Sequence, residues 1–314
     1  MKTHYTTAVA RAARCIQRGG VVAFPTETVY GLGASALNAR AVAAIFRAKG
    51  RPGDNPLIVH VASRADVLRV AETVPPVARR LMDAFWPGPL TLVLPRHPDL
   101  PDRVTAGLAT VGVRLPAHPL ARAFLRAAGT PVAAPSANRS GRPSPTTWRA
   151  VKEDLDGRIA CVLKGNRSRV GLESTVVDCT GPVPIVLRAG SVSLEQLRAI
   201  APRTRMANAR DRERGRSPGL RHRHYAPKAR VVLGGKPSRA ATTRAAWIGI
   251  GAPPAVFSHS RSCRSVTAYA REVFHFFREC EAQGIRTIYC AKVPEIGIGA
   301  ALMDRLRRAA RATC

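Results

Sequence analysis

The stretch that most constrains the fold is an apolar run that opens into a polar, glycine-containing segment. Residues 21–24 read Val-Val-Ala-Phe, which is typical of a short buried strand. Pro25 cannot donate a ladder hydrogen bond, so we expect the strand to end there. Residues 26–30 then bring three hydroxyls and a carboxylate, and Gly31 and Gly33 can take a positive φ or let a ligand approach the backbone. Open α/β sheets bind ligands at such strand ends, although an ordinary turn has the same composition.

Two cations follow at the end of the next predicted helix. Apolar residues recur with helical spacing over 40–48, Gly50 stands where a C-cap is expected, and a second strand is predicted over 57–61. Lys49 and Arg51 therefore lie at a helix-to-strand junction, near the first loop if the two strands are neighbours. An ammonium and a guanidinium beside glycine-rich backbone suit a polyphosphate. Two cations at a helix C-terminus also complement the helix dipole, so both interpretations stay open at this point.

The two motifs together resemble the L-threonylcarbamoyladenylate synthase family, whose catalytic domain is called YrdC-like. The segments that carry the resemblance are Phe24–Gly33 and Ala48–Leu57. It implies an α/β fold: a twisted, open mixed sheet with helices and a concave basic pocket. It also implies an enzyme that joins L-threonine, bicarbonate and ATP into threonylcarbamoyl-AMP and releases pyrophosphate. A downstream transferase complex would then place the threonylcarbamoyl group on a tRNA adenosine.

The resemblance also assigns roles to individual residues. Lys49 and Arg51 would be the catalytic residues that neutralise the phosphates, with Mg²⁺ carried in mainly by ATP and no metal site in the protein itself. The residues implied to hold L-threonine are Thr26, His60, Arg114 and Ser174. The residues implied to hold the nucleotide, besides the two cations, are Thr110, Ser136, Asn138, Ser144, Arg188 and Tyr225.

Several of these residues have an ordinary structural interpretation as well. An arginine in an apolar strand, such as Arg114, is usually an exposed-face residue, and Ser136 and Asn138 follow a predicted strand as common turn residues do. Glu27 is a tempting general base, but a carboxylate in a strand-end loop more often caps backbone N–H groups. No general base is therefore assigned, and carbamate formation followed by adenylyl transfer needs only positioning and charge neutralisation.

The patterns along the chain predict three regions. Alternating strand and helix patterns give a catalytic domain over residues 1–200. Residues 201–230 are rich in arginine and lack an apolar period, which predicts a linker; residues 217–227 resemble the linker signature of the long synthases, which folds over the active site. Residues 231–314 predict a small α/β, Rossmann-like domain. Residues 164–166, Lys-Gly-Asn, depart from the family, which usually has an acidic residue and two glycines there.

Composition defines the competing functions. The net charge of +30 comes mostly from arginine and favours polyanions, yet the charges are dispersed and aromatic residues make up only 5%. The alternative function is a double-stranded RNA or ribosome-binding protein that uses a basic concave sheet, and weak RNA binding is an expectation for the synthase too. A carbamoyl-adenylate-forming relative from hydrogenase maturation is a nearer alternative, which the linker signature and the short chain disfavour.

The remaining motifs predict little chemistry. The seven cysteines form no CxxC pair and their number is odd, which argues against a zinc site and a disulfide framework. His222 and His224 lack a third metal ligand nearby. Gly297 and Gly299 look like a phosphate loop but match a dinucleotide fingerprint poorly. No apolar run approaches a membrane span and no apolar signal segment opens the sequence, so we expect a cytoplasmic protein without membrane contact.

Overall fold

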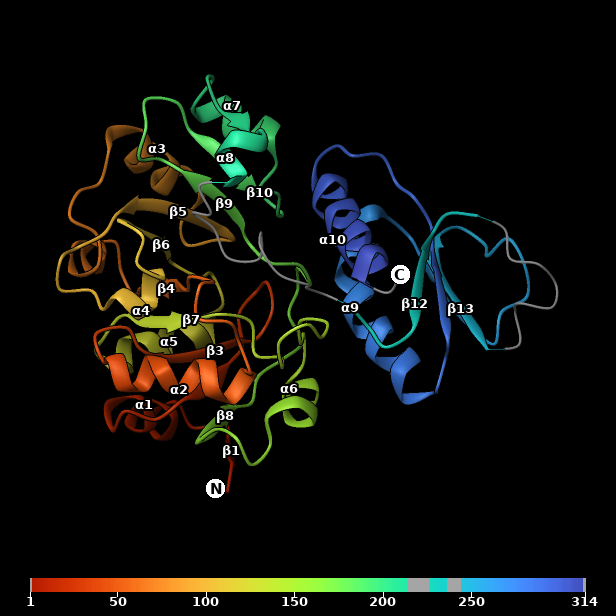
Figure 1. Ribbon diagram of the computed structural model, residues 1–314, viewed down its shortest axis with the longest axis horizontal. Helices are drawn as coiled ribbons and strands as arrows, with labels where there is room; N and C mark the ends of the chain where they lie inside the picture. Colours follow the sequence, from red (N-terminus) through yellow and green to blue (C-terminus); the bar gives the residue numbers. More distant parts are fainter. Residues whose placement is uncertain (1, 214–225, 236–243, 313–314) are drawn as a thin grey trace.

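The computed structural model describes residues 2–213, 226–235 and 244–312. These residues form a large domain and a smaller one at the end of the chain (Figure 1). The helices of the large domain are α1 (Val9–Gln17), α2 (Ala39–Lys49), the 3₁₀ helix η1 (Ala65–Arg69), α3 (Pro76–Phe85), α4 (Asp102–Thr105), α5 (Pro119–Ala128), α6 (Trp148–Leu155), α7 (Leu194–Ile200) and α8 (Ala209–Glu213).

A single large sheet organises this domain. Its strands are β1 (His4–Thr6), β2 (Val22–Phe24), β3 (Gly31–Ser35), β4 (Ile58–His60), β5 (Leu90–Pro95), β6 (Thr110–Arg114), β7 (Val132–Ala134), β8 (Cys161–Leu163), β9 (Thr175–Asp178), β10 (Ile185–Arg188) and β11 (Arg205–Met206). They lie in the order β1-β8-β2-β3-β7-β4-β6-β5-β9-β10-β11. Parallel pairs such as β4 with β6 alternate with antiparallel pairs such as β5 with β6, so the expected mixed α/β sheet is confirmed.

Hydrophobic clusters cover the two faces of this sheet. On one face, α1 and α5 pack on β2, β7 and β8 through residues such as Ile16 and Phe124. On the other face, α2, α3, α6 and α7 pack through residues such as Ile45, Leu81 and Leu197. Gly50 caps α2 in the left-handed conformation, as the sequence predicts. The helices place Lys49 and the strand ends of the central sheet within reach of one another.

One expectation for the opening motif is wrong. Gly31 and Gly33 belong to β3 and neither has a positive φ, so they are not loop glycines. A Cβ on Gly33 would lie 2.5 Å from Val132 Cγ1 and 2.9 Å from Phe24 Cε1. The glycine is required because the side chains of β7 and β2 pack directly against the β3 backbone.

The stretch expected to be a linker begins as part of the large domain. β11 pairs in parallel with β10, and Ala207 packs in a small cluster with Val176 and Leu187. The arginine-rich sequence gives no apolar pattern for this strand, because the strand is short, lies at the sheet edge and fully buries neither Arg205 nor Met206. Most of the linker signature, including Tyr225, lies outside the described residues.

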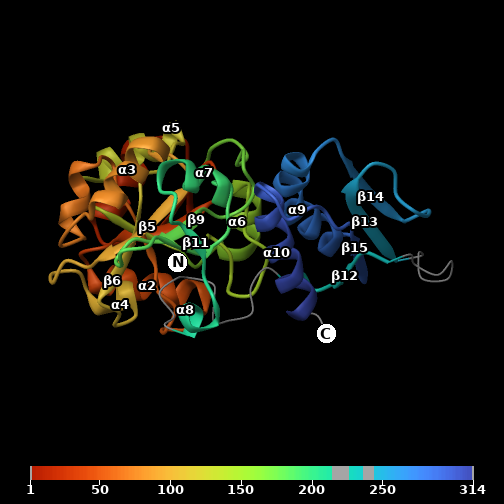
Figure 2. The ribbon, with the colours of Figure 1, turned by 90° about the horizontal axis from the view of Figure 1, so that it is seen from above.

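The small domain is a parallel α/β unit. Its elements are β12 (Arg230–Leu233), β13 (Ala245–Ile250), β14 (His259–Cys263), α9 (Val266–Ala282), β15 (Thr287–Cys290) and α10 (Ile298–Ala312). The strands are all parallel, in the order β12-β15-β13-β14. Both α9 and α10 lie on the side of the small sheet that faces the large domain (Figures 1 and 2). No helix among the described residues is long and apolar enough to span a membrane.

Candidate active site

A pocket that is partly open to solvent lies on the sheet face that carries α1 and α5. Ile58 of β4 pairs with Ala134 of β7, and His60 pairs with Arg114 of β6, so these residues share that face. The described residues that line the pocket are Thr26, Thr28, Val29, Tyr30, Gly31, Arg51, Ile58, His60, Arg114, Ala134, Pro135, Ser136, Glu173, Ser174 and Arg188. The predicted residues that it brings together are Thr26, Arg51, His60, Arg114, Ser136, Ser174 and Arg188.

Arg114 is a buried cation fixed by the opening motif. Its Nη2 lies 2.6 Å from Glu27 Oε1, its Nη1 donates to Thr28 Oγ1 at 2.9 Å, and its Nε donates to Gly88 O at 3.2 Å. Glu27 also accepts the N–H of Ala117, so it caps backbone as well as pairing with the guanidinium. Burial opposes ionisation of Glu27, but the charge of Arg114 and this N–H hold its pKa below the ordinary value.

His60 lies beside Arg114 and is neutral at physiological pH. Burial, and then the charge of Arg114, lower its pKa to about 3. The ring meets Phe24 edge-on at 5.8 Å, which fixes its plane. Its Nδ1 is buried and has no hydrogen-bond partner among the described residues. A neutral imidazole with an unpaired nitrogen in a pocket wall is suited to bind a polar ligand group.

The hydroxyl of Thr26 is used mainly within its own loop. Thr26 Oγ1 donates to Val29 O at 2.6 Å, accepts the N–H of Thr28 and lies 2.8 Å from the hydroxyl of Thr28. Thr28 in turn accepts from Arg114. The three side chains therefore form one fixed polar wall rather than independent contacts.

Ser174 and Arg188 also line the pocket and contact each other. The Nη2 of Arg188 donates to Ser174 Oγ at 3.2 Å and its Nε donates to Ser174 O at 3.1 Å. The hydroxyl of Thr91 lies 2.8 Å from Ser174 Oγ. β9 begins at Thr175 and β10 ends at Arg188, so adjacent antiparallel strand ends set this contact.

Lys49 holds a loop together and does not line the pocket. Its Nζ donates to Ser136 O at 2.6 Å and to Asn138 O, which uses two of its three N–H donors. Burial, and then the neighbouring charge of Arg51, lower the pKa of Lys49 well below its ordinary value. The Asn138 Nδ2 donates to the carbonyls of Arg139 and Arg142, which closes the same loop. The predicted phosphate role of Lys49 and Asn138 stays a prediction.

Three further predicted residues lie at different places. Arg51 lines the pocket while its guanidinium donates to Asn55 O and Pro56 O. Thr110 begins β6, and its buried Oγ1 has no partner in the described part of the chain. Ser144 is buried and does not itself line the pocket, but it donates to Glu173 Oε1 at 2.5 Å, and Glu173 is a lining residue.

Sequence reasoning missed Tyr30 and Glu173 as parts of the site. Tyr30 lines the pocket, and its phenol donates to Gly165 O at 2.8 Å and accepts the N–H of Gly165 at 3.1 Å. The turn at residues 164–166 is thus joined to the opening motif by hydrogen bonds. Glu173 lines the pocket next to Ser174, and its position after Gly171 in a strand-entry loop was the available signal.

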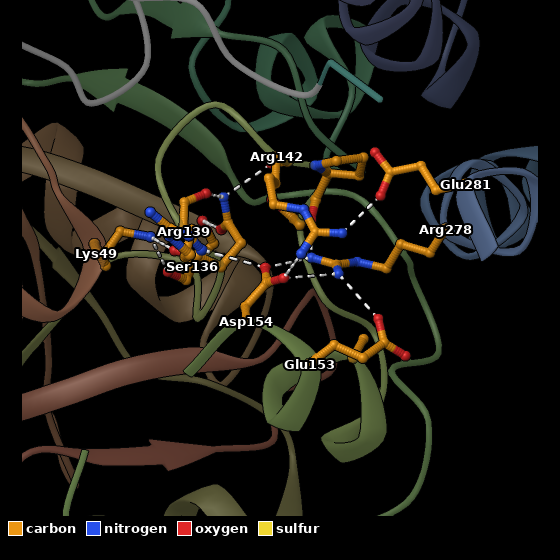
Figure 3. Close-up of polar contacts among 12 residues, drawn as sticks. Lys49, Ser136, Arg139, Arg142, Glu153, Asp154, Arg278 and Glu281 are labelled. Carbon is orange, nitrogen blue, oxygen red and sulfur yellow. Dashed lines mark hydrogen bonds and ion pairs between the residues drawn. The ribbon is translucent and has the colours of Figure 1, made fainter. Parts of the chain in front are cut away.

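A buried ion-pair network joins the small domain to the loop that Lys49 holds. Arg278 of α9 donates from Nη2 to Asp154 Oδ2 at 2.7 Å, and Asp154 also accepts the N–H of Arg139 at 3.2 Å. Arg142 contacts Asp154 and donates to Glu281 of α9 at 2.6 Å. Figure 3 shows these side chains converging between α6 and α9, with Lys49 on the far side of the loop. The small domain therefore supports the pocket loop directly.

The described residues offer no donor set for a resident metal ion. No group of three or more His, Cys, Asp or Glu side chains among them could hold one. The two carboxylates at the pocket, Glu27 and Glu173, are each paired with a buried arginine, Arg114 and Arg305. These carboxylates do not fit the oxygen-rich coordination that a divalent cation requires.

Comparison with known proteins identifies the family. Residues 14–190 match the family described as "Telomere recombination", and residues 192–311 match "Threonylcarbamoyl-AMP synthase, C-terminal domain". The threonylcarbamoyl-AMP synthases of Pyrococcus abyssi and Bacillus subtilis are both 41% identical, covering 95% and 96% of this chain and 92% of each relative. The crystal structure of P. abyssi Sua5 complexed with L-threonine matches with a TM-score of 0.91 at 38% identity, covering 99% of this chain and 98% of that one. The family expected from the motifs is confirmed, and the chain belongs to the threonylcarbamoyl-AMP synthases that carry the C-terminal domain.

Proposed function

We propose that the pocket binds L-threonine, bicarbonate and ATP and that the protein releases threonylcarbamoyl-AMP and pyrophosphate. The observation that carries this proposal is the placement of Arg114, His60, Ser174, Arg188 and Arg51 around one pocket in a chain of this family. The product would pass to a transferase that modifies tRNA. We place the protein in the cytoplasm, where tRNA is available. Weak RNA binding, expected from the net charge, is part of the same proposal.

We assign L-threonine to the end of the pocket formed by Arg114, His60 and Ser174. A guanidinium already oriented by Glu27 can present its remaining N–H to the substrate carboxylate without further ordering. The neutral imidazole of His60 leaves its unpaired nitrogen for the amine or the hydroxyl of the substrate. A free amine held in this way is the nucleophile that bicarbonate needs to form a carbamate.

We assign the nucleotide phosphates to the end of the pocket formed by Arg51 and Ser136, with Lys49 behind it. Lys49 lies behind the pocket loop, and its protonated Nζ would have one N–H donor beyond the two that it gives to Ser136 O and Asn138 O. Burial lowers its pKa, and the negative charge of bound phosphates would favour the protonated form. Positive charge that is fixed before the reaction stabilises the charge that develops during adenylyl transfer. Mg²⁺ would enter as part of the ATP substrate, since the pocket carboxylates are committed to arginines.

Pyrophosphate release from ATP tests the proposed function. We expect release by the full-length protein only when L-threonine and bicarbonate are both present, with threonylcarbamoyl-AMP detected by mass spectrometry. Release without either co-substrate, or no release together with tight, salt-sensitive RNA binding, would overturn the proposal in favour of an RNA-binding protein.

A Lys49→Met variant tests the assignment of the phosphate end. We expect at least about 100-fold slower turnover and weaker ATP binding by calorimetry, because a preoriented cation is lost. The matched control is Arg47→Met, which removes an exposed cation from the same helix and should behave as wild type. Undiminished ATP affinity in Lys49→Met would overturn the phosphate role and leave the synthase assignment intact.

A further inference from the structure

Arg305 of α10 is a buried arginine of the small domain that reaches the pocket wall. Its side chain is 1% exposed, and it is among the largest fully buried side chains of the described residues. Its Nε donates to Glu173 Oε2 at 2.9 Å, and its Nη2 donates to Ala189 O at 3.0 Å. The Nη1 donates to Asp304 Oδ2 at 2.7 Å, which balances the charge on the other side.

The two distant partners of Arg305 flank the two side chains of one pocket wall. Glu173 immediately precedes Ser174, and Ala189 immediately follows Arg188. Ser174 and Arg188 bond to each other and both line the pocket. A single guanidinium thus joins the backbone segments that carry both lining groups.

The surroundings of Glu173 make this contact sensitive to the loss of Arg305. The other carboxylate oxygen of Glu173 accepts from Ser144, and the residue is only 6% exposed. A buried carboxylate that loses its counter-ion must move toward water or take up a proton. Either response of Glu173 would shift Ser174, because Ser174 is the next residue in the chain.

Hydrophobic packing fixes Arg305 at this place. Val29 of the pocket lining and Leu172, next to Glu173, lie in the same buried cluster as Leu302 and Leu306 of α10. Gly171 has a φ of 82°, and a Cβ there would lie 2.8 Å from Ala270 O of α9. The backbone of the pocket loop is therefore held against both helices of the small domain, and Arg305 has little freedom to follow a displaced partner.

We propose that Arg305 is a positioning residue for L-threonine binding, through which the small domain sets the places of Ser174 and Arg188. This inference rests on the proposed function of the pocket. Arg305 does not itself line the pocket. It acts through Glu173 and the carbonyl of Ala189. The small domain therefore helps to position residues of the substrate site in the large one.

Calorimetric titration of L-threonine into full-length variants tests the role. Arg305→Met, which keeps the length of the side chain and removes its charge, should bind L-threonine at least about tenfold more weakly. Arg305→Lys can keep the pair with Glu173 but not both contacts, so its affinity should lie between those of wild type and Arg305→Met. Arg308→Met, which removes the neighbouring partner of Asp304 on the same helix, is the matched control and should bind as wild type.

The outcomes separate a positioning role from a purely structural one. A structural role would lower the unfolding temperature of Arg305→Met while the folded protein kept its L-threonine affinity, and that result would overturn the proposal. If Arg305→Met does not fold, wild-type affinity in a folded Arg305→Lys would overturn it equally. Failure of the wild type to bind L-threonine would overturn the proposed function itself, whereas normal wild-type binding with unchanged variants would overturn only the role of Arg305.

Discussion

Glu27 Oε1 lies 2.6 Å from Arg114 Nη2, and each of the two side chains is 4% exposed. Arg114 lines the pocket, and the pair joins the opening motif to the end of β6. A buried pair is costly to break because the remaining charge has no water to replace its partner. The orientation of Arg114 therefore depends on a residue of the loop between β2 and β3.

Replacing Glu27 by Gln should destabilise the protein by about 3 kcal/mol at pH 7, because Arg114 is left buried without a counter-ion. Urea unfolding measures this difference. The pKa of Glu27 is lowered from 4.5, so its contribution is present above about pH 4.5 and is lost as pH falls through the lowered value. The difference between wild type and variant should shrink at acid pH, and a difference that is constant with pH would contradict the assignment.

The buried His60 should make the folded protein sensitive to acid. Its folded-state pKa is about 3, whereas an unfolded histidine has about 6.5, so only the unfolded state takes up a proton between these values. Stability contributed by His60 is present above about pH 6.5 and falls as pH decreases toward 3. His60→Gln should flatten this part of the dependence of unfolding free energy on pH. Equal slopes in the wild type and in His60→Gln would contradict the prediction.

Arg278→Met should cost about 3 kcal/mol, because Asp154 is fully buried and loses its bidentate partner. Arg261→Met is the control, since Arg261 pairs with Glu272 and Glu279 on a partly exposed surface and should cost no more than about 1 kcal/mol. Chemical denaturation of the full chain measures both. A loss in Arg278→Met no larger than in the control would show that Arg142 alone can balance Asp154.

Gly33→Ala should destabilise the protein by roughly 1–3 kcal/mol, because the added methyl would overlap Val132 and Phe24. Gly53→Ala has nothing within 4 Å of its added methyl and should change stability by no more than about 0.5 kcal/mol. Thermal unfolding compares the two. An unaffected Gly33→Ala would mean that β3 can move away from β7 without cost.

Motif spacing predicted the α/β class, the C-cap at Gly50 and most strand positions, because apolar runs and glycine breaks report local structure directly. It did not predict β14, whose residues His259 to Cys263 alternate polar and small side chains at a sheet edge. It also placed Gly31 and Gly33 in a loop, since the need for close packing against β7 arises only from tertiary contacts.

The prediction of site residues was limited in the same way, because tertiary contacts do not appear in local sequence patterns. Residues near the opening motifs, such as Thr26 and Arg51, could be named from their own segments. The contribution of Arg305 could not, because a helix 132 residues away supplies the partner of Glu173. The position of Lys49 and the family resemblance predict a phosphate role, whereas the structure also gives it two carbonyl partners that no spacing pattern reveals.

Val29 and Leu172 belong at once to the pocket loops and to the hydrophobic cluster of the small domain. A ligand that orders these loops would therefore also strengthen the contacts that the loops make with α9 and α10. Linkage is reciprocal, so a substrate that tightens the interface by some factor is itself bound more tightly by that factor when the interface is closed.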